Sequence, residues 1–235
     1  MRRGGRQVAL QFRTWGGVRA GAGRPPKRRV AGVSHLRRPP VLAQHPLHVT
    51  LRVQRGVPSL RGTLFPRVQA ALALSRERFG FRLAHFSVQG DHLHLIVEAD
   101  DRRALSRGMQ GLCVRVARAV NRGLRRRGSL FADRYHARTL TSPRTLRMAL
   151  RYVLLNARKH GRAQLAPGFV DECSSAAWFG DFARPAGLAF GAQQCRASVT
   201  QLLPGLDAPV ARPQSWLLRV GFLRAGPFDL DDVPG

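Results

Sequence analysis

Two histidines separated by a single residue, His92 and His94, have the type and spacing that could do chemistry in this chain. They lie in residues 89–98, where polar and apolar residues alternate, and this alternation predicts a β-strand. One face of the strand carries His92, His94, Ile96 and Glu98, and the opposite, apolar face carries Leu93, Leu95 and Val97. Imidazoles at positions i and i+2 lie side by side and can bind one divalent cation. The alternative is a pair of polar side chains on a solvated sheet face.

A tyrosine downstream lies at the edge of a predicted helix. Ser142 can cap this helix, Pro143 suits its first position and Gly161 can end it after His160. The apolar face consists of Leu146, Leu150, Val153, Leu154 and Ala157, and a polar stripe beside it consists of Tyr152, Asn156 and Lys159. A tyrosine that only filled space would lie within the apolar face, so its place at the edge favours a reactive role.

Together these side chains suit phosphodiester chemistry. A tyrosyl oxygen can attack a phosphodiester when a metal ion neutralises the phosphate and helps the 3′-oxygen to leave. Two neutral histidines would leave such a cation most of its charge and open coordination positions. Asn156 can offer an oxygen to the metal while the same helix directs Tyr152, and Lys159 or an arginine can hold phosphate.

The charge of the chain points to a polyanionic partner. It has 235 residues, with 40 Lys and Arg against 13 Asp and Glu, a formal net charge of +27. All the basic residues except Lys27 and Lys159 are arginine, and the first acidic residue is Glu77. A GC-rich coding sequence can explain arginine in place of lysine, but it does not explain the scarcity of acids. We therefore expect nucleic acid as the partner.

The cysteines and the hydropathy pattern indicate the compartment. Cys113, Cys173 and Cys195 lack the spacing of a metal finger, and their odd number argues against a disulfide scaffold. No apolar run approaches membrane length, and the basic N-terminus lacks the apolar segment of a secretory signal. We expect a cytoplasmic, nucleoid-associated protein with no membrane partner.

The elements that must position the site follow one another in a recognisable order. Strands are predicted at Pro46–Val53, Arg82–Gln89, residues 89–98 and Ser129–Thr141, and helices at Phe65–Phe79 and Arg103–Arg127, before the helix of Tyr152. The two-residue loop Gly90–Asp91 predicts a tight hairpin that places Ser87 opposite His94. This order predicts an α+β fold with a ferredoxin-like antiparallel sheet (βαββαβ) and a C-terminal catalytic helix.

Composition divides the chain into three parts. Residues 1–44 are rich in Gly, Pro and Arg and predict a basic, disordered arm, in which Gly23-Arg24-Pro25 weakly matches the core of an AT-hook. Residues 45–161 hold the predicted domain. Residues 162–235 are expected to form an accessory segment and a tail, with one helix near Gln193–Leu203.

Several other side chains have predicted roles. Basic residues on the second helix, the last strand and the last helix are expected to contact DNA: Arg115, Arg118, Arg122, Arg125, Arg134, Arg138 and Lys159. The only other tyrosine, Tyr135, is expected to pack in the core. We expect a solvated or structural role for His48, and structural roles for His85 and His136.

Three segments resemble a known family. Residues 90–98 resemble the HUH motif of histidine, hydrophobic residue and histidine, while residues 131–136 and Tyr152 to Asn156 resemble the two downstream blocks of single-tyrosine HUH transposases. The match is closest to the REP-associated tyrosine transposase group and spans roughly residues 45–180.

The resemblance implies a ferredoxin-like nuclease domain that binds single-stranded or hairpin DNA, holds Mg²⁺ or Mn²⁺ and forms a 5′-phosphotyrosine intermediate. It implies that His92 and His94 are metal ligands and that Tyr152 is the nucleophile. Asn156 aligns with the third metal-ligand position, where other members carry glutamine.

Two other interpretations are left by the sequence. The first is a catalytically inactive or domesticated protein that binds DNA hairpins through the same basic face. The second is a basic protein associated with RNA or the ribosome, which fits the charge but leaves the histidines and Tyr152 unexplained. Monomer and homodimer are both compatible with the sequence.

Overall fold

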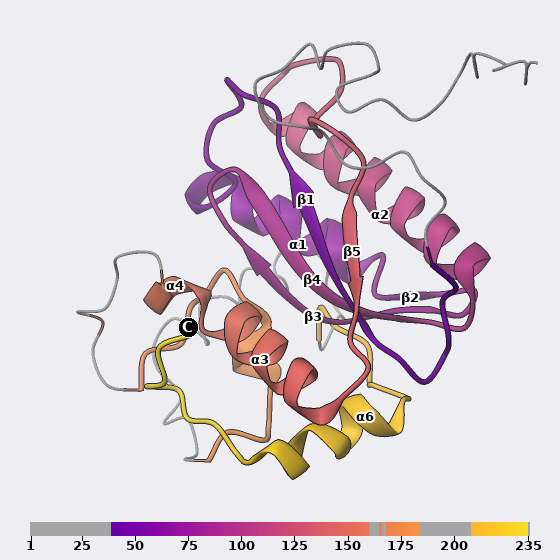
Figure 1. The fold of residues 1–235 in the computed structure, drawn as a ribbon. Coiled ribbons are helices and arrows are strands. Elements are labelled where there is room, and N and C mark those ends of the chain that lie inside the picture. The colour runs from indigo at the N-terminus through magenta and orange to yellow at the C-terminus, as the bar shows by residue number, and fades with distance from the viewer. Residues whose placement is uncertain (1–38, 160–164, 166–167, 184–207, 235) are drawn as a thin grey trace, which may run out of the picture. The chain divides into compact units, whose positions relative to one another are not determined.

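The computed structural model describes residues 39–159, 165, 168–183 and 208–234, and for Lys159 the backbone alone. Five antiparallel strands form one sheet in the order β2–β3–β4–β1–β5 (Figure 1). The strands are β1 (Leu47–Arg52), β2 (Glu77–Arg78), β3 (Phe81–Val88), β4 (His92–Ala99) and β5 (His136–Thr139). Apart from the short β2, the order and connections are those of a ferredoxin-like βαββαβ sheet, so the predicted α+β fold is confirmed.

Helices cover both faces of the sheet (Figure 1). They are α1 (Phe65–Ala73), α2 (Arg102–Gly123), α3 (Pro143–Leu154), α4 (Asn156–Lys159) and α6 (Trp216–Arg219), with 3₁₀ turns at Gly62–Leu64, Ser175–Trp178 and Gly221–Ala225. On one face, the alternate apolar residues of β1, β3 and β4 pack against α1 and α2. On the other face, Ala84 and Ile96 pack against α3 and the C-terminal residues. No helix in the described part of the chain is long and apolar enough to cross a membrane.

The hairpin between β3 and β4 has the predicted register. Ser87 pairs with His94, His85 pairs with Ile96, and the backbone N–H of Gln89 donates to the carbonyl of His92 at 2.8 Å. A β-bulge between Leu83 and His85 shifts the pairing further along the strands. The prediction that the face of the two histidines continues across the hairpin is therefore confirmed.

A buried carboxylate at the end of this face anchors the C-terminal segment. The side chain of Glu98 is 0% exposed, and its oxygens accept hydrogen bonds from the backbone N–H groups of Gln214 and Ser215, both at 2.8 Å. Arg82 donates to the same carboxylate at 3.2 Å and to Asp100 at 2.8 Å. Since a buried charge is tolerated only when it is paired and hydrogen-bonded, Glu98 fixes where residues 214–215 lie.

The first helix is shorter than predicted. We expected it to reach Phe79, but α1 ends at Ala73, because the following residues form a hairpin in which Arg78 pairs with Phe81. Phe79 therefore leaves the predicted apolar face of the helix and lies in the hairpin turn with its side chain 74% exposed.

The second helix and the last strand also end early. Helix α2 stops at Gly123, because Arg125 takes a left-handed φ of 48° and the N–H of Arg126 bonds back to the carbonyl of Asn121. The strand predicted over residues 129–141 is ladder-paired only at His136–Thr139, with one isolated bridge from Phe131. Before the bridge, side-chain hydrogen bonds to the carbonyls of Gly128, Ser129 and Phe131 hold the chain as a loop, with Asn121, Arg126 and Ser129 as the donors.

The helix of Tyr152 is interrupted, contrary to the prediction of one helix to His160. Leu155 leaves helical geometry with φ −108° and ψ 20°, so Tyr152 lies on α3 and Asn156 begins α4. Behind the break, Arg158 donates to the carbonyl of Leu230 at 2.8 Å and to Asp231 at 2.7 Å. The spacing of apolar residues in the sequence does not predict these tertiary hydrogen bonds. Residues 1–38 of the basic arm, His160 and the helix expected near Gln193–Leu203 lie outside the described residues, while Val41, near the end of the predicted arm, packs against the core.

One buried histidine makes the stability of the fold depend on pH. Complete burial lowers the pKa of His85 from 6.5 to about 4, while its Nδ1 lies 3.3 Å from Ser175 Oγ. A group whose pKa is depressed by folding stabilises the folded state above its unfolded pKa, and this contribution is lost as the pH falls from 6.5 toward 4. We expect the free energy of unfolding to fall by up to about 3 kcal/mol across this window from His85.

Urea unfolding of the wild type and of His85→Asn at several pH values measures this effect. The Asn variant should show a shallower fall between pH 6.5 and 4, whatever its absolute stability. Equal slopes for the two proteins would contradict the assignment.

Candidate active site

The register of three strands brings a group of polar side chains onto the sheet face that α3 covers. Thr50 on β1 pairs with His94 on β4 and with His136 on β5. Two residues earlier on β1, His48 pairs with Ile96 and with Arg138. Directly paired residues of antiparallel strands project to the same face. Of the two roles expected for His48, the structure contradicts the solvated one, because His48 is half-buried and its Nε2 lies 3.2 Å from Nδ1 of His94.

A neighbouring carboxylate fixes the tautomer of the first histidine. His92 Nδ1 lies 2.7 Å from Oδ1 of Asp91, and this hydrogen bond lowers the pKa of the Asp91 carboxyl. An ionised carboxylate only accepts hydrogen bonds, so Nδ1 of His92 carries the hydrogen. Its Nε2 is then left with a lone pair, which is the arrangement found in metal-ligating histidines oriented by a carboxylate.

The second histidine lies between β1 and the tyrosine. His94 is 5% exposed, and its Nε2 lies 3.3 Å from the hydroxyl oxygen of Tyr152. Its Nδ1 lies 3.2 Å from Nε2 of His48 and 3.3 Å from Oγ1 of Thr50. When Nδ1 carries the hydrogen, Thr50 and His48 are the acceptors at hand, and Nε2 faces Tyr152 as a base or ligand.

The rings form one compact group. The ring centroid of His94 lies 4.7 Å from that of His92, 4.9 Å from that of Tyr152 and 5.2 Å from that of His48. Burial, followed by the charges of Arg138 and His136, lowers the pKa of His48 from 6.5 to about 4. His48 is therefore neutral at physiological pH and can accept a hydrogen bond from His94.

Capping and tail contacts hold the helix that presents Tyr152. Ser142 Oγ accepts from the N–H of Thr145 at 3.3 Å, and Thr145 Oγ1 accepts from the N–H of Ser142 at 3.1 Å, so α3 begins with a reciprocal capping box. Leu146, Ala149, Leu150, Val153 and Leu154 bury the predicted apolar face of α3. On its outer face, Arg147 donates to the carbonyl of Gly226 at 2.7 Å. The C-terminal segment thus packs on the same helix as the tyrosine.

The amide predicted as a third metal ligand is buried without a partner. Asn156 is 1% exposed, and neither its side-chain oxygen nor its nitrogen has a hydrogen-bond partner among the described residues. Buried polar groups are nearly always hydrogen-bonded, because an unmade bond costs free energy. An amide in this state can still donate or accept a hydrogen bond, or offer its oxygen to a ligand. Because of the break at Leu155, it does not share one continuous helix with Tyr152.

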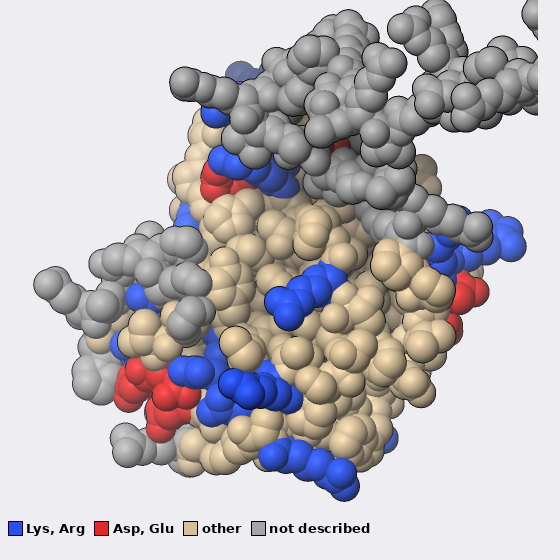
Figure 2. Space-filling model, in the orientation of Figure 1, with Lys and Arg blue, Asp and Glu red and all other residues tan. Residues whose placement is uncertain are grey.

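The predicted DNA-binding arginines are divided between the two faces of the sheet. Arg115, Arg118 and Arg122 are on α2, with Arg125 just beyond it, and α2 covers the face opposite to Tyr152. Arg138 is on β5 near His48, and Arg134 is exposed in the preceding loop. The side chain of Lys159 lies outside the described residues. Figure 2 shows one face of the molecule, where basic side chains stand in several separate groups with fewer acidic ones.

Sequence reasoning missed His48, Thr50 and Asp91 as members of the site. The signal for His48 and Thr50 is the pairing of β1 with β4, which alternation within a single strand does not specify. The signal for Asp91 is its position beside a histidine, but its place in a two-residue loop gave a sufficient structural reason for an aspartate.

The side chains predicted as metal ligands can be compared with what a divalent cation requires. The described residues hold no cluster of three or more His, Cys, Asp or Glu side chains that could bind a metal ion. They do hold two adjacent imidazoles, one with its tautomer set by Asp91, and the unpaired amide of Asn156. Nitrogen and oxygen donors of this kind fit Mg²⁺ or Mn²⁺ only when water or a substrate completes the coordination shell.

Comparison with known proteins identifies the segment that carries this site. Residues 42–156, just under half of the chain, match the sequence profile of a family described as IS200-like transposases. A solved structure of the REP-associated tyrosine transposase bound to a REP hairpin aligns with a TM-score of 0.45 and 16% identity, covering 55% of this chain and 74% of the other. No curated protein matches the chain.

The unpaired amide generates a stability prediction. Replacing Asn156 by leucine removes two unsatisfied polar atoms from a buried position, so the free energy of unfolding should rise by about 1 kcal/mol. Urea denaturation measures the change. Asn121→Leu is the matched control: its oxygen also has no partner in the part of the chain that the structure describes, but its nitrogen donates to the carbonyl of Gly128 at 2.8 Å, and the loss of this bond should offset any gain. A clear loss of stability in Asn156→Leu would mean that the amide supports the fold itself.

Proposed function

Because residues 42–156 match the profile of the IS200-like transposases, we propose that this chain is a transposase of that kind, which cleaves and transfers single-stranded DNA with Tyr152 as the nucleophile. The observation that carries the proposal is the 3.3 Å approach of the Tyr152 hydroxyl to Nε2 of His94 within one chain. His92 beside them completes the HUH pair, with its ring centroid 4.7 Å from that of His94.

The reaction proposed is a transesterification at phosphorus. The Tyr152 oxygen attacks, the tyrosyl–phosphate bond forms as the bond to the 3′-oxygen breaks, the phenol gives up its proton and the departing oxygen gains one. One end of the strand is then a 5′-phosphotyrosine and the other a free 3′-hydroxyl. Reversal of the same step by a different 3′-hydroxyl transfers the strand.

The residues that would hold Mg²⁺ or Mn²⁺ are Nε2 of His92, Nε2 of His94 and the amide oxygen of Asn156. When bound, the cation supplies charge neutralisation at the phosphate and at the departing 3′-oxygen. On this proposal the protein prepares these donors through Asp91, which sets the tautomer of His92, and through Thr50 and His48, which lie within 3.3 Å of Nδ1 of His94 and would accept its hydrogen.

The proposed substrate is single-stranded DNA next to a hairpin. Support comes from the net charge of +27 and from the solved REP-associated tyrosine transposase, which is bound to a REP hairpin. Arg138 pairs with His48 on the sheet and, on this proposal, would contact the phosphates close to the scissile bond. On this proposal the chain falls in the REP-associated group.

Covalent attachment to DNA tests the nucleophile. Purified protein, Mn²⁺ and a labelled hairpin with single-stranded flanks should give a slowly migrating adduct on a denaturing gel, and EDTA should prevent it. Tyr152→Phe should give no adduct and bind DNA within about twofold of the wild type, since only the hydroxyl is lost.

The matched control is Tyr135→Phe, because Tyr135 and Tyr152 are the only tyrosines of the chain. It should form the adduct as the wild type does. An adduct that persists in Tyr152→Phe would refute the assignment, and tight binding without any adduct in the wild type would favour a DNA-hairpin-binding protein without catalysis.

Salt dependence tests the contribution of the arginines to binding. Each phosphate of single-stranded DNA that is neutralised should contribute about −0.7 to the slope of log K against log salt. We expect a slope steeper than about −2, measured by fluorescence anisotropy in EDTA. A slope near zero would mean that the positive charge of the chain does not contribute to DNA binding.

A further inference from the structure

The turn between β2 and β3 carries an aromatic residue that the backbone does not favour. Arg78 pairs with Phe81, so Phe79 and Gly80 form a two-residue loop, with φ of 49° and 76° respectively. Two positive φ angles define the type I′ turn, whose first central position is usually asparagine, aspartate or glycine. A bulky side chain at positive φ is strained, and such strain is found most often at functional positions.

Packing does not explain Phe79 either. Its side chain is 74% exposed, and it is absent from both hydrophobic cores. The guanidinium of Arg78 lies over the ring, 4.9 Å from its centroid, and Phe79 is still 74% exposed. A strained, exposed aromatic ring that adds nothing to the core indicates a binding surface.

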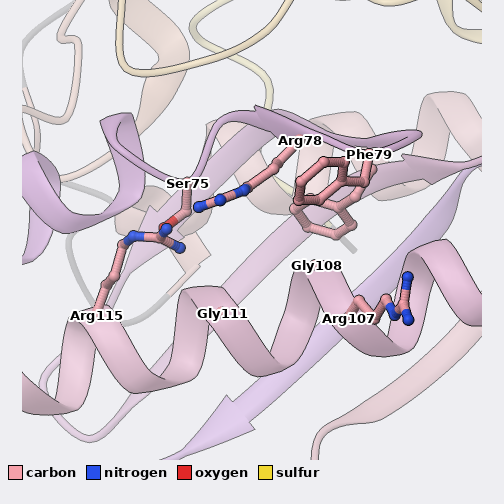
Figure 3. A pocket seen from close by; sticks show the side chains of 8 residues that line it. Ser75, Arg78, Phe79, Arg107, Gly108, Gly111 and Arg115 are labelled. Atoms are coloured by element: carbon pink, nitrogen blue, oxygen red, sulfur yellow. The ribbon is translucent and has the colours of Figure 1, made fainter.

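Beside this ring, the turn and α2 enclose a hollow of about 270 Å³ (Figure 3). Arg78, Arg107 and Arg115 line it together with the ring of Phe79. Gly111 leaves room for Arg115, whose Nη1 would lie 3.0 Å from a Cβ at that position. Figure 3 shows the guanidinium groups of Arg78 and Arg115 pointing toward one another. Two cations brought together in this way favour an anion between them.

No carboxylate neutralises this hollow. Its lining includes neither Asp nor Glu, and within the described residues Arg78, Arg107 and Arg115 form no ion pair. Two acidic side chains that adjoin Phe79 already have partners: Asp100 accepts from Arg82 at 2.8 Å, and Asp101 caps α2 through the N–H of Ala104 at 2.7 Å. These acids line a second hollow, which shares Phe79 and Arg107 with the first and also includes Arg103.

We propose that this hollow is a second contact for single-stranded DNA, in which an unpaired base stacks on Phe79 and the adjoining phosphates are held by Arg78, Arg107 and Arg115. Aromatic stacking and clustered arginines are how proteins bind single strands without reading their sequence. The contact rests on the proposed function and extends it to a second part of the same substrate. Helix α2 covers the sheet face opposite to Tyr152. The contact would bind a part of the substrate that lies away from the scissile bond.

The test measures binding of a labelled oligothymidylate to the full chain in EDTA by fluorescence anisotropy. Phe79→Asn should weaken binding about tenfold, within the range for one stacked base, while Phe79→Trp should bind as tightly as the wild type. The Asn variant should also melt at or above the wild-type temperature, because Asn-Gly suits the turn. A loss of affinity can then not be ascribed to unfolding. DNA should also quench the added tryptophan of Phe79→Trp beyond the quenching seen in the wild type.

A matched pair tests the arginines. Arg107→Ala should weaken binding, whereas Arg102→Ala, which removes the same charge from an exposed position of α2 outside the hollow, should have a smaller effect. Equal binding by Phe79→Asn and the wild type, or equal effects of the two arginine variants, would overturn the proposal.

The binding assay and the adduct assay together distinguish failure of this proposal from failure of the proposed strand cleavage. Adduct formation by the wild type together with unchanged binding in Phe79→Asn would reject the second contact alone. Weakened binding in Phe79→Asn without any adduct in the wild type would reject the nucleophile and leave the second contact standing. If Phe79→Asn weakened the binding of an acidic peptide but left the binding of oligothymidylate unchanged, the hollow would be a site for a protein partner and the assignment to DNA would be overturned.

Discussion

The pairing of β1 with β4 is the constraint on which the site depends. It pairs Thr50 with His94 and places His48, two residues earlier on β1, on the same sheet face. Since side chains alternate along a strand, a slip of one residue would move these groups into the core of α1 and α2. The alternate apolar residues of β1, such as Val49 and Leu51, are fully or nearly fully buried on that other side and prevent the slip. The core thus fixes the register, and the register assembles the polar group.

Covering a polar sheet face creates a second requirement, which the C-terminal segment meets. The apolar side of α3 buries Ile96, while Glu98 on the same face is paired with Arg82 and with two backbone N–H groups of residues 214–215. The segment then returns along α3 and α4, where Arg147 on α3 and Arg158 on α4 donate to its carbonyls. Tyr152 is therefore presented by a helix that is fixed on both sides. Such fixation matters because a nucleophile displaced by about 1 Å can lose about two orders of magnitude in rate.

Much of this arrangement could be predicted from the sequence, because local patterns specify it. The alternation of residues 89–98 and the Gly90–Asp91 loop predict the hairpin, its register and the burial of Leu93 and Leu95. The ferredoxin-like order follows from the sequence of elements, and the capped start of α3 follows from Ser142 and Pro143. These features depend on neighbours in the chain.

The features that could not be predicted depend on residues far apart in the chain. His48 and His94 are 46 positions apart, and only strand pairing brings them within 3.2 Å. The break at Leu155 accompanies bonds from Arg158 to residues 230–231, which helical periodicity does not contain. Phe79 was assigned to a helix face because it continues the apolar spacing, whereas pairing of residues 77–78 with 81–82 takes it into a turn. In each case tertiary contacts override a local preference.

The central claim is that His92, His94 and Tyr152 of one chain form a single metal-dependent site. The most direct measurement labels the tyrosine rings with ¹³C and titrates Mn²⁺, whose paramagnetism broadens the NMR signals of nearby nuclei. The chain has two tyrosines. The signals of Tyr152 should disappear at substoichiometric Mn²⁺ while those of Tyr135 persist, and His94→Ala should abolish the difference. Equal broadening of both tyrosines, or selective broadening that survives in His94→Ala, would contradict the claim.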